Sequence, residues 1–157
     1  MSFVALPPSP TSPEGAFVAG DGWYPAIDCN AMRDALRITD QITHARLLGA
    51  IEGGLLTVEG ELAFWRATQE SAGFANLAAV DPLRMMADQH RLTLLYTRAV
   101  RFSAAAELAE LHRDLSATTE GQTRAEPQML TAEDYRKLAT QAVRDILGEP
   151  RVAVELI

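Results

Sequence analysis

Three histidines and one cysteine are the side chains best suited to chemistry, and their placement does not favour an active site. His44, His90 and His112 lie on three separate stretches, without an acidic residue at the Glu-x-x-His spacing of di-iron helix bundles. Cys29 is the only cysteine, which excludes an internal disulfide and a cysteine-cluster zinc site. We therefore predict no metal and no cofactor, and interpret the histidines as surface or helix-face residues.

Motifs of catalysis are missing as well. The chain has no Gly-x-Ser-x-Gly elbow, no phosphate-binding glycine loop and no dinucleotide fingerprint. Cys29 stands at a predicted helix start, where the helix dipole could activate it, although a buried inert thiol is the alternative interpretation. We predict that the chain is not an enzyme, and keep a small hydrolase built on Cys29 or the histidines as a minor alternative.

Arginines form a second candidate constellation. Arg84, Arg91 and Arg98 recur every seven residues, and Arg101 follows, so a helix would carry them along one line. One interpretation is a solvated face that pairs with neighbours such as Asp88. Another is that these arginines meet acidic groups of an adjacent copy. A third is contact with DNA, as in a DNA-handling module or small packaging subunit.

Composition limits the partners. The chain has 157 residues, of which 48% are hydrophobic and 22% charged, so one domain with a core is expected. Its net charge of −7 repels phosphate, which disfavours binding nucleic acid through counterion release. No apolar run approaches a bilayer-spanning length and the amino terminus does not resemble a signal peptide. We expect no membrane contact, and assembly in the cytoplasm.

The first 27 residues contain five prolines and neither lysine nor arginine. Proline removes backbone donors and disfavours helix before it, so residues 1–27 are predicted to form an extended arm. Phe17, Trp23 and Tyr24 are large aromatics that such an arm would need to bury elsewhere. We therefore expect them to contact another subunit.

Periodicity predicts four helices, in an all-α body over residues 28–148. A short helix follows the N-cap Asp28, and a long helix capped by Thr39 runs to about Ala72 through Gly53 and Gly54, which we interpret as a bend or a close backbone contact. Its apolar stripe consists of Leu48, Ile51, Leu55, Val58, Leu62 and Trp65.

The second long helix is predicted to begin after Asp81 and Pro82. Its stripe consists of Met85, Leu92, Tyr96, Val100, Ala104, Leu108, Leu111 and Leu115. A mobile connection is predicted over residues 117–130, and a capping box of Thr131 and Asp134 opens the C-terminal helix, which ends at Gly148.

The tail over residues 149–157 alternates like a strand, although the helical body offers it no sheet. Two interpretations stay open: it adds to another chain's surface, or it folds back along its own helices.

Four stretches of the chain resemble the head completion proteins of temperate, contractile-tailed bacteriophages, over roughly residues 20–157. They are "WYPAIDCNAMRDALRITDQITHARLLGAI", "ELAFWRATQESAGFANLAAV", "LYTRAVRFSAAAELAELHRD" and "GEPRVAVELI". The features that match are Pro25 with Asp28, Ala45-Arg46-Leu47, Glu61-Leu62 with Trp65-Arg66, Ala72-Gly73-Phe74, Tyr96 with Arg98-Ala99-Val100, and Pro150-Arg151 leading to Ile157.

The resemblance implies a structural virion protein at the head-tail junction, assembled in the host cytoplasm. Copies would form a ring, with a dodecamer expected, beneath the portal protein after DNA packaging. The ring would receive a tail terminator or other neck protein, and genomic DNA would pass through its acidic lumen without specific binding. Portal docking is assigned to Arg151, Val152, Val154, Leu156 and Ile157. Contacts between subunits are assigned to Phe17, Trp23, Tyr24, Arg84, Arg91 and Arg98.

Overall fold

The computed structural model describes residues 12–38, 42–116 and 130–150, and shows a mostly helical body. Its five α-helices are α1 Cys29–Leu36, α2 His44–Glu61, α3 Ala63–Ser71, α4 Arg91–Ser116 and α5 Ala132–Leu147. Its short strands are β1 Phe17–Val18, β2 Ile27–Asp28, β3 Met85–Met86 and β4 Gln89–His90, and a 3₁₀ turn covers Leu77–Ala79. The predicted helical class holds, whereas the simple four-helix, all-α body does not.

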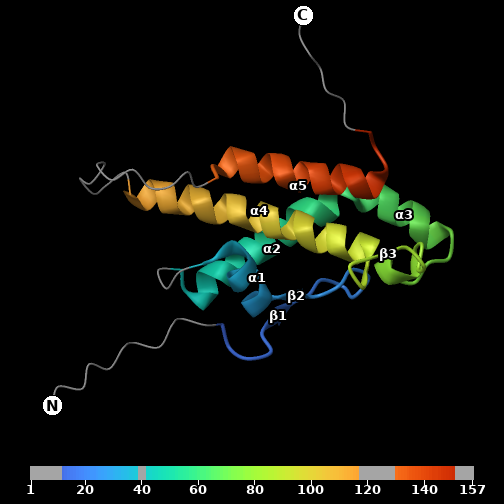
Figure 1. Ribbon diagram of the computed structural model, residues 1–157, viewed down its shortest axis with the longest axis horizontal. Coiled ribbons are helices and arrows are strands. Elements are labelled where there is room, and N and C mark those ends of the chain that lie inside the picture. The colour runs from blue at the N-terminus through green and yellow to red at the C-terminus, as the bar shows by residue number, and fades with distance from the viewer. Residues whose placement is uncertain (1–11, 39–41, 117–129, 151–157) are drawn as a thin grey trace, which may run out of the picture.

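Helix α4 is the central element of the body. It lies between α2 and α5, and α5 runs antiparallel alongside it (Figure 1). The stripe predicted for this helix is buried from Leu92 through Tyr96, Val100 and Ala104 to Leu108. Near its end, Leu111 is exposed, and the side chain of Leu115 falls outside the described residues. The middle of α4 therefore carries the hydrophobic core.

The long helix predicted up to Ala72 is two helices. Helix α2 ends at Glu61, Leu62 adopts φ −89° and ψ −1°, and α3 starts at Ala63. The N-cap of α2 is Thr43, whose hydroxyl accepts a hydrogen bond from the Arg46 backbone N–H at 3.3 Å. The predicted cap Thr39 lies outside the described residues. The break therefore falls at a buried leucine and not at the glycine pair.

The glycine pair provides the close approach of α2 to α4. A Cβ at Gly54 would lie 3.0 Å from the Val100 carbonyl oxygen and 3.2 Å from the Ala104 backbone nitrogen. At Gly53 a Cβ would overlap the carboxylate of Glu107. Of the two interpretations left open, a close backbone contact is therefore confirmed.

The second long helix starts nine residues later than predicted, because a hairpin precedes it. Asp81 has a left-handed backbone with φ 57°, so it turns the chain instead of capping a helix. Strands β3 and β4 then pair antiparallel, with Met85 opposite His90, and Ala87 and Asp88 form the turn. Met85 thus belongs to an exposed hairpin and not to the core stripe.

Residues 12–28 are part of the body, contrary to the extended arm predicted for residues 1–27. Strands β1 and β2 pair antiparallel, and the Leu77 N–H donates to the Trp23 carbonyl oxygen at 2.9 Å. Trp23 is 6% exposed and Tyr24 is 4% exposed, so this chain buries both rings itself. Residues 1–11 lie outside the described residues.

Two helix ends follow the predicted local chemistry. The Asp28 carboxylate accepts hydrogen bonds from the N–H groups of Asn30 at 2.8 Å and Ala31 at 3.0 Å, which caps α1. Thr131 and Asp134 form the predicted capping box of α5, and Gly148 closes that helix with φ 74°. These signals hold because they depend on neighbouring residues only.

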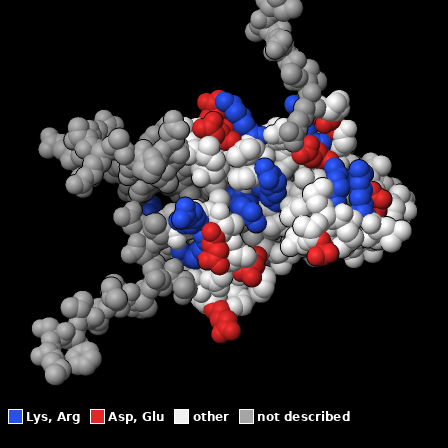
Figure 2. Space-filling model, in the orientation of Figure 1, with Lys and Arg blue, Asp and Glu red and all other residues white. Residues whose placement is uncertain are grey.

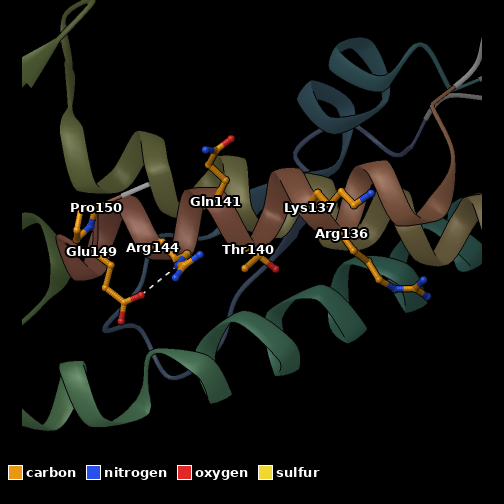
Figure 3. A pocket seen from close by; sticks show the side chains of 7 residues that line it. All are labelled: Arg136, Lys137, Thr140, Gln141, Arg144, Glu149 and Pro150. Carbon is orange, nitrogen blue, oxygen red and sulfur yellow. Dashed lines mark hydrogen bonds and ion pairs between the residues drawn. The ribbon is translucent and has the colours of Figure 1, made fainter. Parts of the chain in front are cut away.

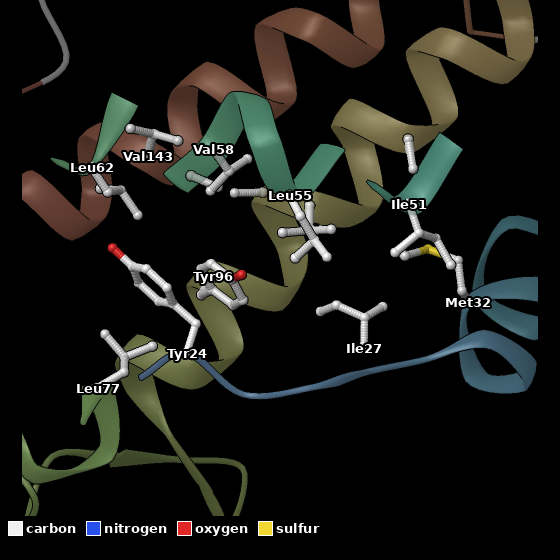
Figure 4. Close-up of a cluster of buried hydrophobic side chains, with 14 of the residues drawn as sticks. Tyr24, Ile27, Met32, Ile51, Leu55, Val58, Leu62, Leu77, Tyr96 and Val143 are labelled. Carbon is white, nitrogen blue, oxygen red and sulfur yellow. The ribbon is translucent and has the colours of Figure 1, made fainter. Parts of the chain in front are cut away.

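The core beneath α2 is aromatic and aliphatic. Tyr24 and Tyr96 face each other among Ile51, Leu55 and Val58 (Figure 4). Their rings stack in parallel with centroids 4.5 Å apart, so the N-terminal segment is fastened to α4. None of the helices formed by the described residues has the length and apolar character of a membrane span.

Candidate interaction surfaces

Arg66, in the first half of α3, holds the N-terminal segment against the body through Asp21 and Trp23. The Arg66 guanidinium pairs with Asp21 and with Glu70, at 2.9 Å for the latter, and lies 5.1 Å from the centroid of the Trp23 ring. The hydrogen bond from Arg66 holds the pKa of the Asp21 carboxyl below its usual range, and the Asp21 bond raises the pKa of Arg66. This cluster is a structural clamp, since Arg66 already has two carboxylate partners.

The two stacked tyrosines differ in their hydrogen bonding. Tyr96 donates from its hydroxyl to the Glu59 carboxylate at 2.8 Å, whereas the buried Tyr24 hydroxyl has no hydrogen-bond partner among the described residues. Burial raises the pKa of both phenols, and for Tyr96 the bond to Glu59 raises it further. Neither hydroxyl is therefore available as an ionised nucleophile at neutral pH.

The predicted arginine line is divided between two elements. Arg84 lies in the hairpin, 63% exposed, and pairs weakly with Asp81 at 3.7 Å. On α4, Arg91 donates to the Asp145 carbonyl oxygen of α5 at 3.1 Å, and the Arg98 guanidinium lies 5.0 Å from the centroid of the Phe102 ring. Of the three interpretations, intramolecular pairing describes Arg91 and Arg98 in this chain.

The histidines and the cysteine have structural environments where the structure describes them. His90 precedes α4: its Nδ1 accepts from the Thr93 backbone N–H at 3.4 Å, so its Nε2 carries the proton donated to the Val80 carbonyl at 2.9 Å. His44 Nδ1 lies 2.9 Å from the Ser12 hydroxyl. Cys29 is fully buried, and burial raises the pKa of its thiol, so activation at the helix start is not supported.

Charge is mixed on the surface. In Figure 2 basic and acidic side chains are interspersed on the face shown, without a continuous basic track. A shallow hollow of about 420 Å³ on α5 is lined by Arg136, Lys137 and Arg144 among others (Figure 3). Each of these cations pairs with a carboxylate, of Glu110, Glu133 and Glu149 in turn. The hollow therefore has little net charge with which to attract an anion.

The three most exposed large apolar side chains among the described residues lie at two places that the sequence patterns did not identify. The first is the β3–β4 hairpin, where Leu83 is 93% exposed. The second is the side of α2 and α3 that faces away from α4, where Leu56 is 78% exposed and Phe64 93% exposed. The sequence did contain an indication of the second place, because Leu56 and Phe64 are hydrophobic residues that lie outside the apolar stripe predicted for this helix.

Several predicted positions are not tested by the described residues. The portal-docking residues Arg151, Val152, Val154, Leu156 and Ile157 lie outside them, as does most of the connection over residues 117–130. Phe17 is exposed on β1, as a contact residue would need to be, whereas buried Trp23 and Tyr24 are not positioned to meet a neighbouring copy. Among the described residues, no three His, Cys, Asp or Glu side chains are grouped to hold a metal ion.

Comparison with known proteins assigns the chain to the structural proteins of bacteriophage heads. A family described as phage head completion protein (GPL) matches residues 18–157. The chain therefore belongs to the phage head completion protein family, as the sequence resemblance predicted. It is a virion component with a structural role in the phage head, and this role agrees with the prediction that it is not an enzyme.

One relative supports the same assignment over nearly the whole length. The chain is 31% identical over 160 residues to the head completion/stabilization protein of Escherichia phage P2, which covers 95% of this chain and 94% of the relative. No solved structure matches the chain.

Proposed function

We propose that this protein is a ring-forming adaptor at the head-tail junction, which binds the portal after DNA packaging and provides the platform for tail attachment. Its family membership across residues 18–157 is the observation that carries this proposal, because the match extends through the C-terminal tail. In this proposal copies of the chain form a dodecamer, the portal lies on one side, and a tail terminator or other neck protein lies on the other.

The C-terminal tail is the proposed portal contact. Residues Val152, Val154 and Leu156 alternate with Arg151, Ala153 and Glu155, so an extended tail would present one apolar edge. Gly148 ends α5 in a left-handed conformation, and Glu149 and Pro150 are exposed, so the last described residues lie at the surface. A sequence with one apolar edge that follows a surface position suits addition to another chain's sheet or groove.

The acidic character of the protein suits a channel through which DNA moves. With a net charge of −7 per chain, a ring of copies would repel the duplex and prevent it from adhering. Arg91 and Arg98 are engaged within the chain, so the structure adds no support to the alternative of a DNA-handling module. Phe17, Arg84 and Arg98 are the exposed members of the predicted inter-subunit set; Phe17 and Arg84 are retained here for that role, whereas Arg98 lies over the Phe102 ring of its own chain.

Portal binding is tested by pull-down of purified portal with the full chain. Val154→Asp places a charge on the apolar edge of the tail, and Ala153→Asp places the same charge on the opposite edge as a matched control. We expect Val154→Asp to lose portal binding and Ala153→Asp to keep it, with identical circular dichroism. Equal binding by both variants would contradict docking through the tail, and duplex DNA retention by the full chain at about 0.15 M salt would favour DNA handling.

A further inference from the structure

Helices α2 and α3 expose large apolar side chains and glycines at positions that do not pack in the core. Four exposed residues are spaced by whole helical turns. About two turns separate the first pair and one turn each of the next two pairs: Gly49, Leu56, Gly60 and Phe64. Residues one helical turn apart lie on the same face, so Gly49, Leu56 and Gly60 form one strip on α2, and Phe64 follows just after the break at Leu62. We call these four positions the outer face. Glu52 lies one turn before Leu56 and is also exposed.

The outer face contains two glycines that the fold of the chain does not explain. A Cβ at Gly49 or at Gly60 would meet nothing within 4 Å, whereas Gly54 is required by the approach of α4. Glycine in a helix interior costs about 1 kcal/mol relative to alanine. Small residues beside exposed Leu56 and Phe64 suit the close approach of another backbone, so the outer face has the character of a contact surface.

The hairpin presents a second apolar surface. Leu83, Met85 and Met86 are all more than half exposed, and Met side chains adapt their shape to a partner. The hairpin turn at Ala87 and Asp88 has positive φ at both residues, which is unfavourable without glycine. Such strain persists where the position of a segment matters. We call Leu83, Met85 and Met86 the hairpin tip.

The hairpin and the outer face come from different segments of the chain. The hairpin contacts the start of α4 and is drawn beside α3 in Figure 1, whereas most of the outer face belongs to α2. A closed ring of identical chains needs two different surfaces that complement each other. The hairpin tip and the outer face are two different apolar surfaces of this chain.

We propose that the hairpin tip of one copy docks on the outer face of the next copy. This inference rests on the proposed ring of copies and names the interface that would close it. Charge complementarity supports the pairing. Arg84 lies within the hairpin between Leu83 and Met85, whereas Glu52 lies on the outer face and Glu61 is exposed directly after Gly60. Neither glutamate makes an ion pair with other described residues. The weak, exposed Arg84–Asp81 pair leaves Arg84 free to reorient toward these carboxylates.

Thiol cross-linking between copies tests the proposal. Full-length Leu83→Cys is mixed with full-length Leu56→Cys, with and without purified portal, and treated with a short bismaleimide. Cys29 is fully buried and does not interfere. Leu130→Cys replaces Leu83→Cys in the control mixture, because Leu130 is an exposed leucine two residues before α5, and α5 starts beside the end of α4 that is farther from the hairpin (Figure 1).

We expect the Leu83–Leu56 mixture to give at least about tenfold more dimer than the control, because docking raises the effective concentration of the two thiols. Equal yields from the two mixtures, with and without portal, would overturn the interface. Portal pull-down is read separately on the same samples, so a chain that binds portal without this cross-link refutes the interface and leaves the adaptor proposal standing. A chain that forms the cross-link but does not bind portal refutes the adaptor proposal alone.

Two further variants separate docking from folding. Arg84→Glu should reduce the Leu83–Leu56 cross-link, and combining it with Glu52→Arg and Glu61→Arg on the partner chain should restore the yield. Gly60→Ala should raise the urea midpoint of unfolding, since it adds a helix-favouring residue in open space, yet lower the cross-linked yield. A Gly60→Ala variant that cross-links as well as the parent would contradict close approach at the outer face.

Discussion

Substituting Gly54 by alanine tests the packing of α2 on α4. The added methyl would lie 3.0 Å from the Val100 carbonyl oxygen and 3.2 Å from the Ala104 backbone nitrogen. Both neighbours are backbone atoms of a helix, so a single side chain cannot move aside. The whole of α4 must retreat by a few tenths of an ångström, and its contacts with α5 move with it.

Two opposing effects determine the size of the change in stability. Alanine is favoured over glycine by about 1 kcal/mol within a helix. Overpacking of a close interface costs about 1 to 3 kcal/mol. We therefore expect Gly54→Ala to lower the free energy of unfolding by about 1 kcal/mol. Gly49→Ala lies on the same helix with nothing within 4 Å of the new methyl, so it should raise that free energy by about 1 kcal/mol.

Urea unfolding followed by circular dichroism measures both variants, at a protein concentration low enough to keep the chain monomeric. The two free energies of unfolding should differ by about 2 kcal/mol, with equal dependence on urea. Equal stabilisation by both alanines would show that α2 and α4 do not approach closely at Gly54. That result would refute the reasoning for the whole α2–α4 contact.

Three other predictions follow from hydrogen bonds and burial. Tyr96→Phe should destabilise the protein by about 1 kcal/mol in urea unfolding, while Tyr24→Phe should be neutral or stabilising because its hydroxyl has no described partner. Burial, with some repulsion from Glu110, raises the pKa of Glu107 above its ordinary value of 4.5. Ionising Glu107 therefore lowers the stability of the fold as the pH rises past the ordinary pKa. Glu107→Gln should stabilise the protein at pH 7 and have no such effect near pH 3, where Glu107 is protonated in both the folded and the unfolded chain. Arg66→Lys should raise the pKa of Asp21 toward its ordinary value in NMR titration, and the stability that this carboxyl contributes at neutral pH should then be lost at a higher pH during acidification.

Local signals in the sequence predicted the ends of α1 and α5, because a cap depends on a few adjacent residues. Asp28, Thr131 and Gly148 each act where the sequence placed them. The break at Leu62 was missed although Gly60 lies two residues before it, because the apolar stripe continues in phase through Leu62 and Trp65. Its position depends on how α2 and α3 pack on the rest of the body.

The hairpin was missed because its residues imitate a helix start. Asp81 followed by Pro82 is a common cap sequence, and Met85 continues the apolar period of α4. Of the left-handed residues Asp81, Ala87 and Asp88, the two aspartates are tolerated in turns, but Asp81-Pro82 serves equally as a helix start, so the residue types do not decide between the two. Only the paired strands, and the hydrogen bond that His90 donates to the Val80 carbonyl oxygen, account for the conformation.

The N-terminal aromatics show a different limit of prediction from sequence. Trp23 and Tyr24 were correctly expected to need burial, yet a sequence cannot indicate which chain supplies the covering surface. Here the Tyr96 ring and the Arg66 guanidinium of the same chain provide it. The outer face presents the reverse case, because Leu56 and Phe64 are apolar and remain uncovered by their own chain.

The distribution of local costs in this protein supports a division between body and contact surfaces. Gly54 weakens its helix but allows α4 to pack, so the cost is recovered within the chain. Three other residues weaken local structure by about 1 kcal/mol each, and no contact among the described residues compensates for this: Gly49, Gly60 and the left-handed Ala87. Backbone strain of this kind is concentrated at functional sites, where the surrounding structure or a partner holds it. In a protein that completes a phage head, such a partner belongs to the assembled particle, and these residues mark where contacts between chains should be sought first.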